Sequence, residues 1–195
     1  KYLPKQDWSV VSRSTLNDAA RPAADRQLAL SADGARLPII YGRDRRGGLI
    51  ANIVPLSGDI IVQCIWGHGP IDAVEAVYLN DEPVDSWQVR QTHYLGTQSQ
   101  AVDPWLRTAF AAKGIDYWDN LPGVAYSVFR VGDAKFSTAF AATLRGRLVW
   151  DPRSGTIAWS ANPALILADF LASAEYGCAR PVAWASVADA ADACD

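Results

Sequence analysis

His68, His93 and Cys64 have side chains of the types that ligate transition metals or move protons. His68 lies in Gly67-His68-Gly69-Pro70, a turn in which an imidazole can act as a base or a metal ligand. A dedicated zinc site needs three or four ligands at CxxC or HxxxH spacing, which these residues do not have. We therefore expect no metal or cofactor site, with His68 exposed in a turn and His93 on the surface of a strand.

Acids and aromatic residues gather in Asp116-Tyr117-Trp118-Asp119. Two carboxylates on either side of a bound sugar can hydrolyse a glycosidic bond, so one interpretation is a glycan site. The segment ends in Asn120-Leu121-Pro122-Gly123, whose residue types favour turns. We therefore favour a loop whose Asp side chains make turns and whose aromatic rings fold back on the core.

Arg43, Arg45 and Arg46 surround Asp44 in a glycine-rich stretch. Guanidinium groups bind phosphate with two hydrogen bonds each, but the net charge of −3 argues against non-specific nucleic-acid binding. We expect a solvated hairpin tip or a salt bridge between subunits. The sequence contains no GxSxG, GxxxxGK[ST] or GxGxxG motif, so we expect no catalytic residues and no enzymatic activity.

The composition predicts a folded chain, because half of the 195 residues are apolar and a tenth are aromatic. Apolar stretches such as Ile60–Trp66 are far shorter than the ~20 residues of a membrane-spanning helix, and we expect no secretory leader. Because the chain has no methionine and begins at Lys1, we expect a piece of a longer protein. Cys64, Cys178 and Cys194 are expected as reduced thiols, with pairing of the last two left open.

The order of the predicted elements is that of an α+β protein rich in strands. Residues 1–36 show no sustained periodicity and are expected to form an extended arm or linker. Residues 37–150 are expected to form a β-rich domain with one short helix inserted near residues 104–113. Residues 151–195 are expected to be helical, with two helices packed as an antiparallel pair.

Several local patterns predict individual strands. Leu37–Tyr41 and Leu49–Val54 flank Gly42–Gly48 and predict a hairpin with a basic tip. Further strands are expected at 59–66, 73–79, 87–94, 124–131 and 143–150, with a turn at 80–83. In the strand at 143–150, alternation predicts that Leu144, Gly146, Leu148 and Trp150 face the core while Thr143, Arg145 and Arg147 face water.

Cap residues predict the helices. Asp103-Pro104 and Asn162-Pro163 each place an N-cap before a proline in the first turn. Gly114 and Gly177 are expected to end these two helices, and Pro181 to open the last one. The expected buried stripe of the helix after Asn162 is Leu167, Phe170, Leu171 and Ala174, with Asp169 on the opposite face. The expected stripe of the last helix is Trp184, Val187, Ala188, Ala191 and Cys194.

Three groups of motifs, taken in order, resemble the N-terminal half of one family. The first is Ile40-Tyr41-Gly42-Arg43 with Gly47-Gly48, and the second is Gly69–Val74 with Val77–Val84. The third runs from Leu144–Asp151 through Ser160–Ala164 and Leu171–Gly177 to Trp184-Ala185 and Cys194-Asp195. In this order they resemble the tail tip (central hub) protein J family of long-tailed phages and prophages.

The resemblance implies a structural role in the virion, at the tail tip, for a protein made in the bacterial cytoplasm. Family members close the distal end of the tail tube as trimeric hubs, so the implied partners are further copies in a homotrimer of the full-length protein, distal tail proteins and other tail tip proteins. It implies no catalytic residue, no cofactor, no specific nucleic-acid binding and no membrane span. Trp8, Trp87 and Trp118 are candidates for such interfaces. The alternative is a tail-associated glycan-binding or cell-wall-degrading module that uses Asp116 and Asp119.

Overall fold

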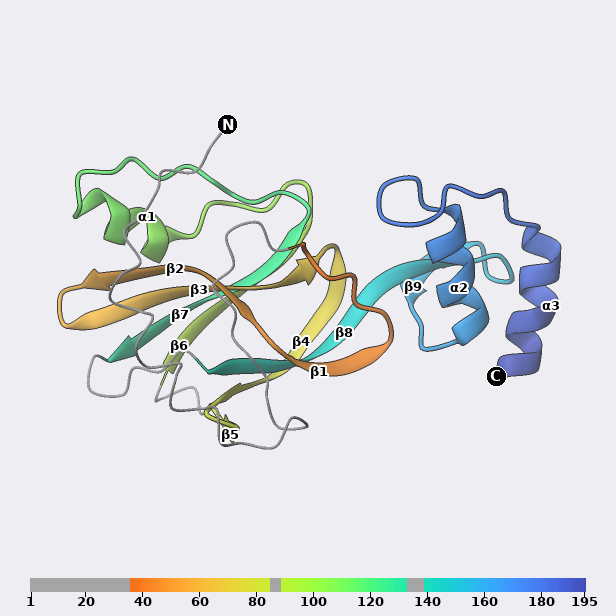
Figure 1. Ribbon diagram of the computed structural model, residues 1–195, viewed down its shortest axis with the longest axis horizontal. Helices are drawn as coiled ribbons and strands as arrows, with labels where there is room; N and C mark the ends of the chain where they lie inside the picture. The colour runs from red at the N-terminus through yellow and green to blue at the C-terminus, as the bar shows by residue number, and fades with distance from the viewer. Residues whose placement is uncertain (1–35, 85–88, 133–138) are drawn as a thin grey trace.

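The computed structural model describes residues 36–84, 89–132 and 139–195. Within these ranges the chain forms nine strands and three helices, a strand-rich α+β fold as the sequence predicts (Figure 1). The strands are β1 (Arg43–Gly47), β2 (Leu49–Leu56), β3 (Asp59–His68), β4 (Ile71–Leu79), β5 (Glu82–Pro83), β6 (Val89–Leu95), β7 (Val124–Gly132), β8 (Phe140–Asp151) and β9 (Thr156–Trp159). The helices are α1 (Pro104–Ala111), α2 (Pro163–Ala172) and α3 (Trp184–Cys194).

The strands form two antiparallel sheets that lie face to face. One sheet has the order β2-β3-β7-β6, and the other has the order β1-β8-β4-β5, with β9 pairing the far end of β8. Helix α1 covers the outer face of the first sheet (Figure 1). We call the two sheets and α1 the strand body, and we call β9, α2, α3 and their loops the helical unit.

The main core lies between the two sheets. Val62, Cys64 and Trp66 of β3 meet Phe129 of β7 and Leu144 of β8 there. Trp66 satisfies its buried indole N–H by donating to the Ser127 hydroxyl at 2.7 Å, so the largest side chain of this core leaves no polar atom unpaired.

A second core lies between the first sheet and α1. Ile61 of β3 and Tyr126 of β7 pack there against Leu106, Ala109 and Phe110 of the helix. β3 is therefore buried on both faces, as its nearly continuous apolar sequence predicts. The cap prediction for α1 is also confirmed, since the Asp103 carboxylate accepts hydrogen bonds from the backbone N–H groups of Trp105 and Leu106.

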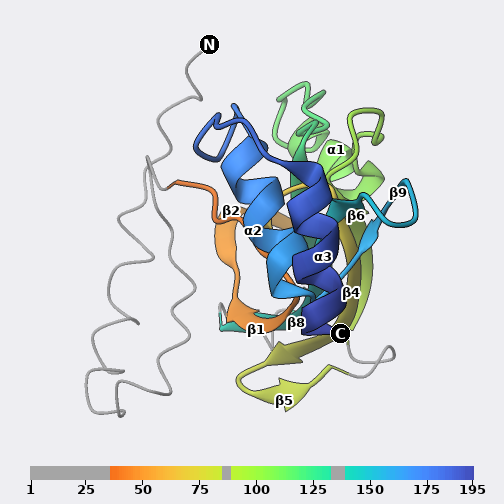
Figure 2. The ribbon, with the colours of Figure 1, turned by 90° about the vertical axis from the view of Figure 1, so that its right-hand side faces the viewer.

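The helical unit continues from the end of β8. α2 and α3 run antiparallel beside each other, as expected (Figure 2). Their shared core is small: Val149 of β8, Leu165 of α2 and Ala191 of α3 are its fully buried members. Asn162 caps α2 as predicted by accepting hydrogen bonds from the backbone N–H groups of Ala164 and Leu165.

The hairpin predicted around Gly42–Gly48 is wrong. Residues 43–47 are themselves strand β1, which pairs with β8, while β2 pairs with β3 in the other sheet. The chain changes sheets at Gly48, where a Cβ would collide with Cys64 Sγ and lie 2.6 Å from Trp66 Cζ3. A glycine is required here because the backbone passes directly over two core side chains.

The predicted facing of β8 is wrong at Thr143, which is 7% exposed where the alternation predicts water, and in the second half of the strand. Arg147 is only 9% exposed, Val149 is buried and Trp150 is exposed, whereas the alternation predicts water around Arg147 and a core position for Trp150. Beyond Arg147 the strand extends past β1 and β4, pairs with β9 and packs against α2 and α3 through Val149. The buried side of β8 therefore changes where its neighbours change.

The stripe predicted for α2 is also wrong. Leu167 is 57% exposed and Phe170 is 39% exposed, while Leu165 and Ala168 are the buried residues. α2 is apolar almost all round, so its sequence does not reveal which side meets β8 and α3. The helix ends at Ala172, before Gly177, where an added Cβ would collide with the Phe170 carbonyl oxygen.

The remaining predictions have mixed outcomes. α3 begins at Trp184 rather than Pro181 and buries Ala191, while Cys194 is exposed. The strand expected at 87–94 is observed from Val89, and residues 85–88 lie outside the described residues. The expected arm, apart from Arg36, also lies outside them, as do Trp8 and Trp87. Among the described residues, no helix has both the length and the apolar character needed to cross a bilayer.

Candidate functional site

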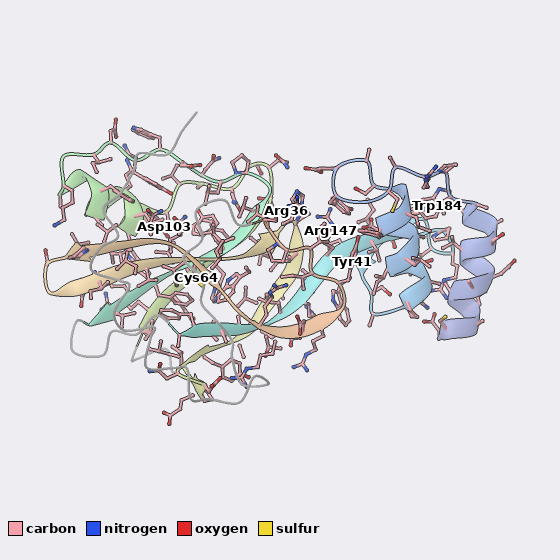
Figure 3. The ribbon with its side chains drawn as sticks, in the orientation of Figure 1. Arg36, Tyr41, Cys64, Asp103, Arg147 and Trp184 are labelled. Atoms are coloured by element: carbon pink, nitrogen blue, oxygen red, sulfur yellow. The ribbon has the colours of Figure 1, made fainter. Side chains whose placement is uncertain are left out.

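A group of interacting polar side chains lies where the strand body meets the helical unit. Figure 3 shows Tyr41 and Arg147 close to each other at this boundary. We call this group the junction cluster. It consists of Tyr41, His68 and Arg147 from the strand body and Asp169, Glu175 and Tyr176 from the helical unit.

Arg147 is the buried centre of the junction cluster. Its Nη1 donates to the Gly69 carbonyl at 2.8 Å and to His68 Nδ1 at 2.9 Å, and its guanidinium lies over the Tyr176 ring at 4.1 Å. The Nε atom is 4.0 Å from Asp169 Oδ2 and has no hydrogen-bond partner within the ranges that the structure describes. A buried cation is stable only when paired, so Arg147 favours the docked position of the helical unit that brings Asp169 and Tyr176 to it.

Asp169 receives hydrogen bonds from both sides of the boundary. Its Oδ2 accepts from the Tyr41 hydroxyl at 2.5 Å and from the Tyr176 hydroxyl at 2.8 Å. Burial raises the pKa of Tyr41 and Tyr176, and their hydrogen bonds to Asp169 raise it further, because a phenolate cannot donate to a carboxylate. Both phenols are therefore neutral donors at neutral pH.

His68 is a member of this cluster and not an isolated turn residue. Its ring is tilted against Tyr176, with the ring centroids 5.6 Å apart, and its Nε2 lies 3.2 Å from Glu175 Oε1. Arginine can only donate, so His68 Nδ1 accepts from Arg147 and Nε2 carries the proton that is donated to Glu175. One neutral tautomer thus satisfies both neighbours.

No spacing in the sequence connects these residues, which come from the chain before β1, the end of β3, β8, α2 and the loop after α2. The one available signal is Arg147 itself, an arginine that the alternation of β8 places on the surface next to apolar Leu148 and Val149. Arg147 fits the alternating pattern as a surface residue, and only the packing of α2 over it makes it the centre of a buried site.

The structure separates the residues of the proposed glycan site. The Tyr117 ring stacks on Phe110 at 4.7 Å and belongs to the core under α1, whereas Trp118 is 58% exposed and is covered on one face by Arg107 at 3.7 Å. Asp119 Oδ1 accepts from the Leu121 backbone N–H, which is the turn role expected for it. Asp116 is exposed.

Two of the three arginines expected at a hairpin tip form ion pairs within the chain. On β1, Arg43 Nε pairs with Glu75 at 2.6 Å, and Arg45 pairs with Asp81 at 3.0 Å while lying over the Tyr78 ring. A phosphate would have to displace these carboxylates, so the geometry favours strand-to-strand pairing over a phosphate clamp. Arg46 Nε is buried without a hydrogen-bond partner among the described residues.

The other candidate ligands lie apart from the junction cluster. His93 is half-buried, shares a hydrogen bond with the Ser127 hydroxyl through its Nδ1, and has its pKa lowered by burial, so it is not the surface residue we expect. Burial raises the pKa of the Cys64 thiol, and Cys178 and Cys194 are free and exposed. In residues 36–84, 89–132 and 139–195, no three His, Cys, Asp or Glu side chains are grouped to hold a metal ion.

Comparison with known proteins gives one informative result. No family model matches the chain, and no curated protein matches it. Among solved structures, a chain from the "Virion of native gene transfer agent (GTA) particle" matches with a TM-score of 0.52 and 17% sequence identity. The match covers 62% of this chain and 29% of that chain, so this chain spans less than a third of that structure's length. At this identity the likeness shows a shared fold.

Proposed function

We propose that this chain is a structural component of a phage or prophage tail tip, within the central hub that closes the tail tube and links it to distal tail and receptor-binding proteins. The observation that carries the proposal is the fold shared with a chain of a gene transfer agent virion. The ordered motifs from Ile40 to Asp195 that resemble the protein J family support the same role.

Exposed apolar side chains supply the surfaces that such assembly needs. Trp118 lies after α1, Trp150 and Ile157 are cross-strand partners in the β8–β9 pair, and Leu167 and Phe170 lie on α2. Large apolar side chains exposed to water contribute strongly when a partner covers them. We propose that further copies in a homotrimer of the full-length protein and neighbouring tail proteins cover these side chains.

The same proposal places the protein in the virion and assigns it no enzymatic role. A net charge of −3 suits the wall of a DNA path, because DNA passes an acidic surface without specific binding. We also propose that the chain is divided into an arm at residues 1–36, a β-rich domain at 37–150 and a helical segment at 151–195.

The mass of the full-length protein in solution tests the proposal, measured alone and with the distal tail protein encoded beside it. We expect a trimer that forms a stable complex. Leu167→Lys should weaken the complex because it places a charge on the exposed apolar face of α2, whereas Lys113→Ala, at an exposed position after α1, should not. If the full-length protein is a monomer and binds no tail protein, the proposed hub role is refuted.

The exposure of Trp118 favours a second candidate, a tail-associated module that binds or degrades glycans with Asp116 and Asp119. Titration with peptidoglycan fragments separates the two candidates. The glycan module predicts saturable binding that is lost in Trp118→Ala, or release of sugar that is lost in Asp119→Asn. The hub role requires neither binding nor release.

A further inference from the structure

We propose that His68 is a proton-sensitive switch that determines whether the helical unit stays docked on the strand body. Docking requires the neutral imidazole, and protonation of His68 releases the junction cluster. The proposal rests on the donor and acceptor geometry around the ring.

Both nitrogen atoms of His68 are committed in the docked state. Nδ1 faces Arg147 Nη1 at 2.9 Å and must accept, because a guanidinium has no lone pair to offer. Nε2 faces Glu175 Oε1 at 3.2 Å and donates. A proton on Nδ1 would point one N–H at another and place two cations in contact, so the imidazolium cannot keep this geometry.

The charged and titratable groups around the ring do not compensate for this clash. β8 contributes Arg147, and the loop after α2 contributes Glu175 and Tyr176. Glu175 attracts the imidazolium, but its side chain is 72% exposed and solvent screens it. Behind Arg147, Asp169 already accepts from Tyr176 and from Tyr41, which belongs to the segment before β1.

Release of the junction cluster leaves few apolar contacts to hold the helical unit in place. The fully buried members of its core, Val149, Leu165 and Ala191, come from the end of β8 and from the two helices themselves. Outside β8, Tyr41 is the residue on the strand-body side that packs against this core. The helical unit therefore keeps its own core when it moves, and the small interface permits movement about β8.

The test measures the distance between two spin labels in the full chain. One label is on the native Cys194 of α3 and the other is on Glu82→Cys in β5, with Cys178→Ser removing the other exposed thiol. We expect one narrow distance population at about pH 8 and a second population at about pH 5, the range across which histidine side chains gain a proton. An unchanged distribution would refute the switch.

Because the chain has two histidines, a matched pair of variants identifies the group responsible. His68→Gln can accept from Arg147 and donate to Glu175 but cannot gain a proton, so it should keep the narrow population at both pH values. His93→Gln should open as the wild type does. Opening in His68→Gln, or its loss in His93→Gln, would overturn the proposal.

A third variant decides the question if His68→Gln does not fold. Glu175→Gln removes the one carboxylate that contacts the imidazolium directly, at an exposed position where folding tolerates the change. The docked imidazolium then loses its attracting carboxylate while the released imidazolium does not, so the opening transition should move to higher pH. A transition at the wild-type pH would show that His68 does not control the opening.

Discussion

The Tyr41 hydroxyl donates a 2.5 Å hydrogen bond to Asp169 Oδ2, joining residues that are 128 positions apart in the chain. Tyr41 precedes β1 and Asp169 lies on α2, so this bond connects the edge of the strand body to the helical unit. The contact is partly buried and its acceptor is a carboxylate, which makes it stronger than a bond between neutral groups.

Tyr41→Phe should lower the free energy of unfolding by about 1.5 kcal/mol or more, since hydrogen bonds to charged groups contribute more than neutral ones. Urea denaturation measures the change. Tyr78→Phe is the matched control, because the part of the chain that the structure describes gives the Tyr78 hydroxyl no hydrogen bond and the ring under Arg45 remains. An equal effect of both substitutions would contradict the role of the Tyr41 hydroxyl.

Gly48→Ala should destabilise the protein by about 3 kcal/mol or more, because the added Cβ overlaps Cys64 Sγ and crowds Trp66. Thermal unfolding followed by circular dichroism measures the loss. Gly132→Ala, where nothing lies within 4 Å of the new Cβ, should leave the melting temperature unchanged or slightly higher. A well-folded Gly48→Ala protein would show that the chain does not change sheets at this point.

Asp103→Ala should cost about 2–4 kcal/mol, because it removes the N-cap of α1 and leaves the Tyr94 hydroxyl without its acceptor. Urea denaturation is again the measurement. Asp116→Ala removes an exposed carboxylate from the nearby loop and should change stability by less than about 0.5 kcal/mol. Similar losses at the two positions would argue against the capping role.

Stability should fall as the pH rises above 10. Burial raises the pKa of Tyr117 to about 12 and also raises the pKa of Tyr94 and Tyr126. The folded state therefore binds the phenolic protons more tightly than the unfolded state, whose tyrosines have a pKa of about 10. The stabilisation is complete below pH 10 and is lost toward the folded pKa, about 12 for Tyr117.

Urea midpoints measured at increasing alkaline pH test this expectation, with tyrosinate absorbance recorded in parallel. The absorbance should appear together with unfolding. Full tyrosinate absorbance at about pH 10 with the native circular dichroism spectrum intact would contradict it.

The sequence was sufficient to predict elements whose signal is local. Asp103-Pro104 and Asn162-Pro163 begin helices because the cap residue and the proline act within one turn. Asn80 and Asp81 both adopt positive φ in the turn between β4 and β5, as their residue types favour. These features depend on neighbours within a few positions and on no other part of the chain.

The sequence could not predict features that depend on distant neighbours. Gly42–Gly48 has the composition of a turn, but β8 pairs with it and makes it a strand. Leu167 is exposed although it is expected in the core, and Asp169 is partly buried although it is expected in water. The position of α2 on β8 and α3 determines which of its faces is buried. The junction cluster was missed for the same reason, since each of its residues is unremarkable until the helical unit packs against the strand body.

β8 is one unbroken strand of 12 residues that pairs with β1 and β4 at its start and with β9 at its end. A pulling force along its axis loads all three hydrogen-bonded ladders in shear, so many bonds must break together. A torque about the same axis meets resistance chiefly from the side chains around Arg147. The molecule should therefore transmit tension along its length and yield first by twisting.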